Sequence, residues 1–222
     1  MTSANFASHL NIKPRCTVAL DCDGVILDFL SHFKTIAKYA LGREMIDHSN
    51  VYDLGVRFGL TPDERARVMH VFDQEGGWGN LPDLDGAIEG ARELQDAGHR
   101  VIVVTAIDEK YRQARLFNFA SLGFNPDAMY CVGTQAGHTK SDAYRLEQPH
   151  AIVDDRLVYL KEAANTIKYH TPELVWINDG VCQNGHESKF VHHEVVALSH
   201  WADPILSKQP TLTVQKKLKL HR

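Results

Sequence analysis

Five short apolar runs alternate with helical segments along most of this chain, and this alternation limits its fold more than any other feature. The runs are, in chain order, CTVALD, RVIVVTA, AMYCVG, HAIVDD and ELVWIND. Strands that alternate with helices are joined by right-handed crossovers, which produce a parallel sheet with helices on both faces. The sequence therefore predicts an α/β fold with a Rossmann-like parallel sheet of at least five strands.

A helical insertion is expected after the first run. The stretch FLSHFKTIAKYAL has apolar residues at helical spacing, with Gly42 as its C-cap. A second helix is predicted over TPDERARVMHVFD, because Thr61 suits the N-cap and Pro62 suits the first turn. We therefore expect a lead-in at residues 1–15, a core at 16–29 and 81–206, a helical insertion at 30–80, and a basic tail at 207–222.

Composition favours a small molecule as the partner of this 222-residue chain. Lys and Arg total 24 against 28 Asp and Glu, so the chain lacks the positive charge that nucleic acid attracts. No apolar run approaches the ~18 residues of a membrane span, and residues 1–15 lack the layout of a signal peptide. The four cysteines form no CxxC pair and suit buried free thiols, which favours the cytoplasm. The sequence leaves both a monomer and a homodimer open.

Polar side chains follow three of the apolar runs, where a buried strand would end. Asp21 and Asp23 follow the first run, Thr105 follows the second, and Asp154 and Asp155 follow the fourth. In a strand, residues i and i+2 point to the same side, so the first two carboxylates would face one small volume. Ligands of open parallel sheets bind at the carboxyl ends of the strands. All these groups can meet if the first strand lies between the second and the fourth.

Four carboxylates in one cleft repel each other at neutral pH unless a cation or shared protons neutralise them. Oxygen ligands without His or Cys select a hard ion, and Mg²⁺ fits best, although the sequence does not separate it from Mn²⁺ or Co²⁺. Lys140, in GHTKSDAY, is the cation placed among these elements that can offset the charge of a phosphate. A carboxylate nucleophile, a metal and a lysine together indicate phosphoryl transfer through an aspartyl-phosphate.

Four segments resemble the motifs of the haloacid dehalogenase (HAD) superfamily, in the same order: DCDGV, VIVVTA, the lysine of GHTKSDAY, and IVDD. The resemblance implies a HAD-like sheet in the order 3-2-1-4-5, flanked by helices, with a small helical cap inserted after the first strand. It implies that Asp21 is the nucleophile and that Asp23 acts as general acid and base. An aspartate at position 23 also favours a phosphatase over a dehalogenase within that superfamily.

The same resemblance implies binding roles for the other motif residues. The implied Mg²⁺ ligands are Asp21, the backbone carbonyl of Asp23, and one or both of Asp154 and Asp155. Thr105 would hydrogen-bond the phosphoryl oxygens, and Lys140 would neutralise them. Gly24 would form a tight turn in which the backbone can approach the ligand closely.

A narrower resemblance, to the 5′(3′)-deoxyribonucleotidase group, covers about residues 17–206. It rests on the helical insertion, the passage LPDLDGAIEGARELQDAGHRVIVVTA, the IVDDR ending and the late SHWADPI. It implies a nucleoside monophosphate as substrate, with Phe72 and Trp78 of the cap stacking on the base. The sequence departs from that group at Ala106, where a second hydroxyl typically contacts phosphate, and at EGGWG, where paired aromatics are typical.

Other interpretations stay open alongside this one. A phosphatase of sugar phosphates or other small metabolites would use the same motifs, and a catalytically idle member would bind a phosphorylated ligand or a protein. Packing competes with base stacking at Phe72 and Trp78, and it is the expected role of Trp201. The stretch CQNGHESKFVHH matches no spacing of a structural zinc site, so we expect a surface loop followed by an edge strand there.

Overall fold

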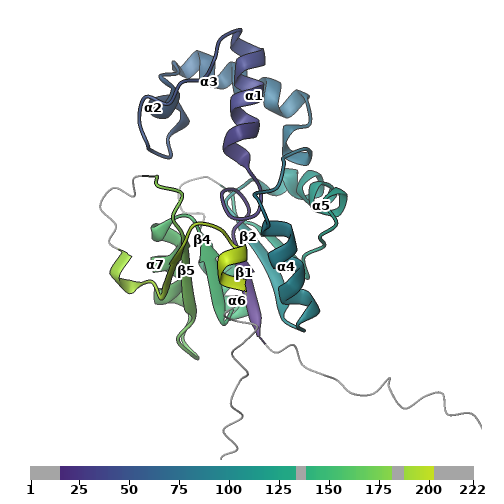
Figure 1. Ribbon diagram of the computed structural model, residues 1–222, viewed down its shortest axis with the longest axis vertical. Helices are drawn as coiled ribbons and strands as arrows, with labels where there is room; N and C mark the ends of the chain where they lie inside the picture. Colours follow the sequence, from purple (N-terminus) through teal and green to yellow (C-terminus); the bar gives the residue numbers. More distant parts are fainter. Residues whose placement is uncertain (1–15, 134–138, 182–187, 203–222) are drawn as a thin grey trace, which may run out of the picture.

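The computed structural model describes residues 16–133, 139–181 and 188–202. Its centre is a six-stranded sheet in the order β3-β2-β1-β4-β5-β6, in which all neighbouring strands are parallel (Figure 1). The strands are β1 (Thr17–Leu20), β2 (Arg100–Thr105), β3 (Ala128–Cys131), β4 (Ala151–Asp154), β5 (Glu173–Ile177) and β6 (His193–Val195). The predicted order of the first five strands is confirmed, and β6 adds an edge strand beside β5.

Strand β1 lies in the middle of the sheet, between β2 and β4. Its Val18 pairs in register with Val101 of β2 and with Ala151 of β4. Leu20 faces one apolar cluster and Ala19 faces another, and both are buried because helices cover both faces of the sheet. The residues directly after Leu20 therefore emerge at the centre of the sheet's carboxyl edge.

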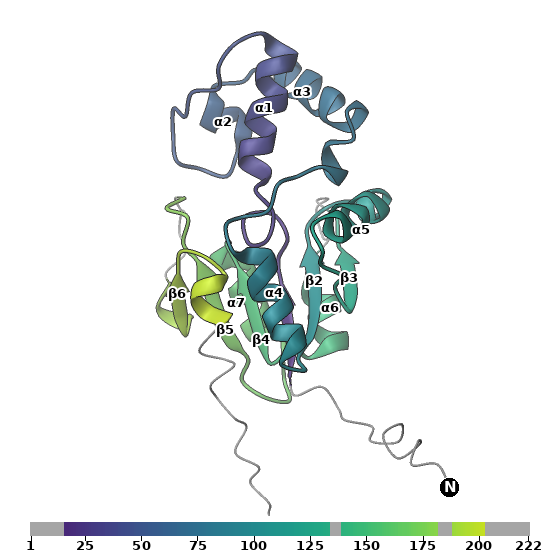
Figure 2. The same cartoon turned by 45° about the vertical axis from the view of Figure 1, so that its right-hand side comes forward.

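Helices pack on both faces of this sheet, and four of them lie between β1 and β5 outside the insertion (Figure 2). They are α4 (Ala87–Asp96), α5 (Arg112–Ser121), α6 (Ser141–Glu147) and α7 (Leu157–Thr166). Leu94 of α4 and Phe119 of α5 belong to the same buried cluster as Leu20. Tyr144 of α6 and Leu160 of α7 belong to the cluster on the opposite face. These two clusters fix the strands, and with them the strand ends that form the site.

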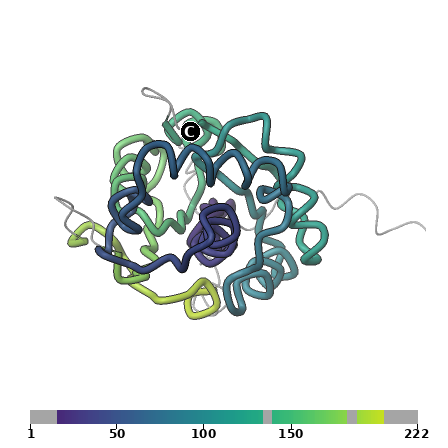
Figure 3. The backbone as a smooth tube through the Cα atoms, turned by 90° about the horizontal axis from the view of Figure 1, so that it is seen from above, coloured from purple at the N-terminus to yellow at the C-terminus, as the bar shows by residue number. Residues whose placement is uncertain are grey.

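Three helices between β1 and α4 form an insertion above the carboxyl edge of the sheet (Figures 1 and 3). They are α1 (Phe29–Leu41), α2 (Leu54–Phe58) and α3 (Pro62–Gln74). As predicted, Gly42 ends α1 in the left-handed conformation at φ 67°, and Thr61 opens α3 with a capping box. Phe33, Phe58 and Val68, one from each helix, pack into a core separate from that of the sheet. The insertion is thus a small helical unit with its own apolar centre.

The described residues also form three short 3-10 helices, η1 (Gly77–Gly79), η2 (Glu109–Tyr111) and η3 (Ser188–Phe190), and residues 199–202 are helical. Helix η1 returns the chain from the insertion to the core, and η2 leads directly into α5. Across residues 16–133, 139–181 and 188–202, no helix combines the length and the apolar character needed to cross a membrane.

Candidate active site

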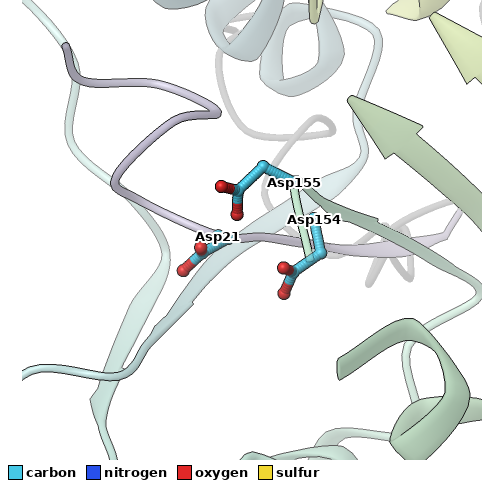
Figure 4. Close-up of side chains that lie close together, drawn as sticks. All are labelled: Asp21, Asp154 and Asp155. Carbon is cyan, nitrogen blue, oxygen red and sulfur yellow. The ribbon is translucent and has the colours of Figure 1, made fainter. Parts of the chain in front are cut away.

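Polar side chains gather at the carboxyl edge of the central strands. Asp21 directly follows β1, Thr105 ends β2, Asp154 ends β4, and Asp155 comes next. Each of the four is at most 8 % exposed. Figure 4 shows the three carboxylates close together, where the chain leaves β1 and β4. The position of β1 between β2 and β4 therefore brings residues that are far apart in the sequence to one place.

Lys140 precedes α6 and is fully buried between two of these carboxylates. Its Nζ lies 2.8 Å from Oδ1 of Asp21 and 2.7 Å from Oδ2 of Asp154, and 4.4 Å from the centre of the Tyr159 ring. Burial lowers the pKa of Lys140, but Asp154 and Asp21 raise it more, so the pKa stays well above its ordinary value. A protonated ammonium group therefore faces Asp21.

Three carboxylates form a candidate metal-binding site within the part of the chain that the structure describes. Oxygens of Asp21, Asp154 and Asp155 all lie within 4.8 Å of one another. Burial, together with neighbouring negative charge, raises the pKa of Asp154 to about 7 and the pKa of Asp155 well above its ordinary range. Lys140 supplies one positive charge against three carboxylates, so a divalent cation would balance the buried charge. The donor set fits a hard divalent ion.

Gly24 lies where the loop after β1 passes directly over Asp155. Its φ is +84°, and a Cβ added to it would lie 2.9 Å from Oδ2 of Asp155. The Gly24 N–H donates a hydrogen bond to the carbonyl of Leu27 at 3.0 Å, which closes a tight turn. Glycine is therefore required here both by the backbone conformation and by the close approach of a carboxylate. Contact of Gly24 with phosphate stays a prediction.

Asp23 has a partner that the sequence analysis missed. Nη2 of Arg115, a fully buried residue of α5, lies 2.5 Å from Oδ1 of Asp23. Burial raises the pKa of Asp23, and the guanidinium opposes this rise only in part. A sequence signal did exist, because Arg115 and the buried Phe119 are four residues apart and share the apolar face of α5. An arginine on that face is a candidate for a buried ion pair.

The two aromatic residues proposed for base stacking lie in an aromatic cluster between the insertion and the core. Phe72 is fully buried, with its ring centre 5.6 Å from that of Phe29 and 5.0 Å from that of Trp78. Trp78 is partly exposed and stacks on Tyr111 at 4.5 Å. Phe72 thus has no free face for a ligand in this conformation, whereas part of Trp78 is accessible.

The segment between α1 and α2 reaches the core at the ends of β4 and β5. The Tyr52 hydroxyl donates to the carbonyl of Asp155 at 2.7 Å, and the guanidinium of Arg156 lies 4.7 Å from the centre of the Tyr52 ring. The Asn50 side-chain amide donates to the carbonyl of Gly180. The insertion is therefore attached directly to the loop that carries Asp155.

The remaining predictions concern residues away from this site. Trp201 is buried in the cluster around α4, which confirms its packing role. His192 accepts a hydrogen bond from the Leu174 N–H, and His193 of the predicted edge strand lies 2.7 Å from Glu173, so both serve strand contacts. Cys182 and His186, like the lead-in and the basic tail, lie outside the described residues.

A surface pocket of about 500 Å³ lies between α2 and α3 on the insertion. Its walls include Val56, Leu60 and Met69, and none of the predicted site residues lines it. It has no group suited to phosphate chemistry other than Arg65, which pairs with Asp53. The cluster of carboxylates at the strand ends therefore remains the candidate site.

The chain matches no protein-family model and no curated protein sequence. A dehalogenase with an intermediate complex aligns at TM-score 0.60 with 16% identity, over 89% of this chain and 100% of that chain. A predicted phosphoglycolate phosphatase from Haemophilus somnus aligns at TM-score 0.58 with 17% identity, over 87% and 99%. A HAD-hydrolase from Bacillus subtilis bound to magnesium aligns at TM-score 0.55 with 16% identity, over 88% and 100%. The chain therefore has the fold of the HAD-like hydrolases.

Proposed function

We propose that this protein is a Mg²⁺-dependent phosphomonoesterase that acts through an aspartyl-phosphate on Asp21. One observation carries the proposal. The buried Asp21 carboxylate, at the end of the central strand, forms an ion pair with the buried Lys140 and lies close to two further carboxylates. This arrangement supplies a nucleophile, a fixed positive charge for phosphoryl oxygens, and ligands for a hard cation. The HAD-like fold of the solved structures described above supports the same reading.

The chemistry follows from the two aspartates of the first motif. An oxygen of Asp21 bonds to phosphorus while the bond from phosphorus to the leaving oxygen breaks, and Asp23 gives its proton to that oxygen. Asp23 then takes a proton from water, whose oxygen bonds to phosphorus as the bond to Asp21 breaks. Inorganic phosphate leaves and both carboxyl groups are restored. The raised pKa of Asp23 suits a group that exchanges a proton twice in each cycle.

The neighbouring residues hold the phosphoryl group in this scheme. Lys140 faces Asp21 and neutralises a phosphoryl oxygen, and Thr105, at the end of the adjacent strand, donates a hydrogen bond to another. Asp21, Asp154, Asp155 and the backbone carbonyl of Asp23 would hold Mg²⁺, which when bound offsets the negative charge of the phosphate. The magnesium-bound Bacillus subtilis structure supports this choice of ion.

The carboxylates favour phosphate ester hydrolysis over dehalogenation, although a dehalogenase is among the similar structures. A halide leaves without a proton, so a dehalogenase has no use for an acid beside the nucleophile. An alkoxide needs a proton as it leaves, and Asp23 is placed two residues from Asp21 in the same loop. Three clustered carboxylates likewise suit a reaction that needs a divalent cation.

We propose a nucleoside monophosphate as the substrate. The partly exposed Trp78 offers an aromatic surface for a base beside the aromatic cluster of Phe29 and Phe72. The insertion, attached through Tyr52 to the Asp155 loop, would cover the leaving group and exclude water. Sugar phosphates and other small phosphate esters are the alternative that a substrate panel separates from nucleotides.

The test is phosphate release from nucleoside 5′- and 3′-monophosphates, sugar phosphates and 4-nitrophenyl phosphate, with Mg²⁺ and with EDTA. We expect turnover that needs Mg²⁺ and is highest with nucleotides. Asp21→Asn should lower the rate by at least about 10³-fold, because the nucleophile is lost. Asp142→Asn is the control, because its carboxylate is 89 % exposed and, among the described residues, pairs with Arg145 at the surface. Full activity of Asp21→Asn would overturn the proposal.

A further inference from the structure

A second buried cation lies beside the predicted acid and base. We infer that Arg115 is a positioning residue that holds the Asp23 carboxyl group in the orientation needed for proton transfer to and from the substrate. This inference rests on the proposed function, and it adds a residue of α5 that the four sequence motifs do not contain. Arg115 acts through Asp23 and does not itself touch the reacting phosphoryl group in this account.

Among the described residues, Asp23 is the one hydrogen-bond partner of the Arg115 side chain. Arg115 has 0 % of its side chain exposed, and its Nη2 lies 2.5 Å from Oδ1 of Asp23. Within the described residues, Nε and Nη1 of the same guanidinium have no hydrogen-bond partner. A buried guanidinium with one carboxylate partner is strongly held to that partner, because separation leaves a charge buried and uncompensated. The pair therefore restricts the Asp23 carboxyl group to one side of the loop.

Arg115 is itself held in place by the segment that returns from the insertion. Its guanidinium carbon lies 5.2 Å from the centre of the Trp78 ring. Nε1 of Trp78 donates to Asp73 at 2.7 Å, and the Tyr111 hydroxyl donates to the same carboxylate at 2.9 Å. Tyr111 also stacks on Trp78. The guanidinium thus lies against a ring that is fixed from two sides, by α3 and by η2.

The two buried cations of this site have different partners. Lys140 forms ion pairs with Asp21 and Asp154, whereas Arg115 forms an ion pair with Asp23. Loss of Lys140 would therefore act on the nucleophile and the phosphoryl charge. Loss of Arg115 would act on the proton transfer, because only the acid and base lose a fixed orientation.

This difference predicts a dependence on the leaving group. An alkoxide must be protonated as its bond to phosphorus breaks, whereas 2,4-dinitrophenolate is stable enough to leave without a proton. A positioned general acid contributes roughly 10²–10⁴-fold to such a step. Loss of Arg115 should therefore lower kcat/KM, which reports on the steps up to phosphorylation of Asp21, far more for an alkyl phosphate than for 2,4-dinitrophenyl phosphate. A residue that only stabilises the fold would slow both esters by the same factor.

The experiment compares kcat/KM for these two esters in the wild-type protein and in Arg115→Met, because kcat also contains the hydrolysis of the aspartyl-phosphate, a step that both esters share. The alkyl ester is thymidine 5′-monophosphate or glucose 6-phosphate, whichever the wild-type protein hydrolyses faster. We expect the ratio of kcat/KM for the alkyl ester to kcat/KM for the dinitrophenyl ester to fall by at least about tenfold in the variant. Arg112→Met is the matched control, because Arg112 starts the same helix and pairs with Glu109 instead of Asp23. Its ratio should equal that of the wild-type protein.

An unchanged ratio in folded Arg115→Met would overturn the inference while leaving the proposed function intact. Should Arg115→Met fail to fold, Trp78→Leu is measured in the same way with glucose 6-phosphate as the alkyl ester, since the substitution removes the ring under the guanidinium and keeps both charges, and this ester has no base for Trp78 to contact. The ratio should again fall, and an unchanged ratio in Trp78→Leu would also overturn the inference. If the wild-type protein hydrolyses neither ester, the proposed function itself fails, and the inference fails with it.

Discussion

At the scale of single residues, buried atoms of the site lie so close together that a larger side chain would not fit between them. Gly24 shows this best, because its backbone passes so near Asp155 that a methyl group would meet the carboxylate at 2.9 Å. Gly42 also has a positive φ, but a methyl group there would meet no atom within 4 Å. The two glycines therefore separate the cost of backbone strain from the cost of displacing a candidate metal ligand.

Replacing each glycine by alanine tests this distinction. Both variants should lose roughly 1–2 kcal/mol in the free energy of unfolding, because alanine disfavours the left-handed region. Only Gly24→Ala should also bind Mg²⁺ several-fold more weakly, since its methyl group pushes Asp155 away from Asp21. Urea denaturation measures the first effect and calorimetric Mg²⁺ titration measures the second. Equal Mg²⁺ affinity in Gly24→Ala, Gly42→Ala and the wild-type protein would show that Asp155 is not held by this contact.

The sequence predicts the residues that the strand ends bring together. Its apolar runs locate the strands, and the polar residues Asp21, Thr105 and Asp154 lie where three of these strands end. The sequence does not predict the Arg115–Asp23 pair or the contact of Gly24 with Asp155. These contacts depend on how α5 and the loop after β1 pack in three dimensions, and local spacing does not encode that packing. The place of Arg115 on an apolar helix face was the available signal.

At the scale of elements, the first five strands and the long helices followed from hydrophobic period, whereas helix α2 did not. Helix α2 has five residues, which is less than two turns of a helical pattern. The three-residue β6 was predicted as an edge strand after a surface loop. Its pairing with β5 is visible only in the folded chain.

The link between the insertion and the core is an element-scale contact that can be tested. Tyr52→Phe removes the hydroxyl that donates to the Asp155 carbonyl, a contribution of about 1 kcal/mol. We expect backbone amides of residues 48–57 to exchange with deuterium roughly fivefold faster, with no change in α4. Tyr169→Phe is the control, because Tyr169 is 86 % exposed. Identical exchange in the Tyr52→Phe and wild-type proteins would mean that this contact does not hold the insertion.

At the scale of the whole molecule, the central strand concentrates negative charge that one lysine does not balance. The pKa of Asp154 is raised to about 7, so the folded protein holds protons that the unfolded chain releases at lower pH. As the pH rises to about 7, the folded protein loses these protons too, and the deprotonated carboxylates then repel one another. A divalent cation removes that repulsion and must compete with the protons.

The stabilisation by Mg²⁺ should therefore depend on pH. We expect the rise in Tm caused by Mg²⁺ to be small near pH 5.5, where Asp154 is largely protonated, and largest at pH 8, where the ligands are free of protons. Differential scanning fluorimetry with Mg²⁺ and with EDTA measures this difference at each pH. A Tm shift of equal size at both pH values would contradict a proton-linked metal site at these carboxylates.

The central claim is that the phosphoryl group passes through Asp21, and the most direct measurement is to trap it there. A reaction with labelled 4-nitrophenyl phosphate and Mg²⁺ is quenched in acid within one turnover, and the digested peptides are analysed by mass spectrometry. The account predicts the phosphoryl group on the peptide that contains Asp21, and none in Asp21→Asn. Phosphate release from the wild-type protein without a phosphorylated peptide, or with the group on another residue, would contradict it.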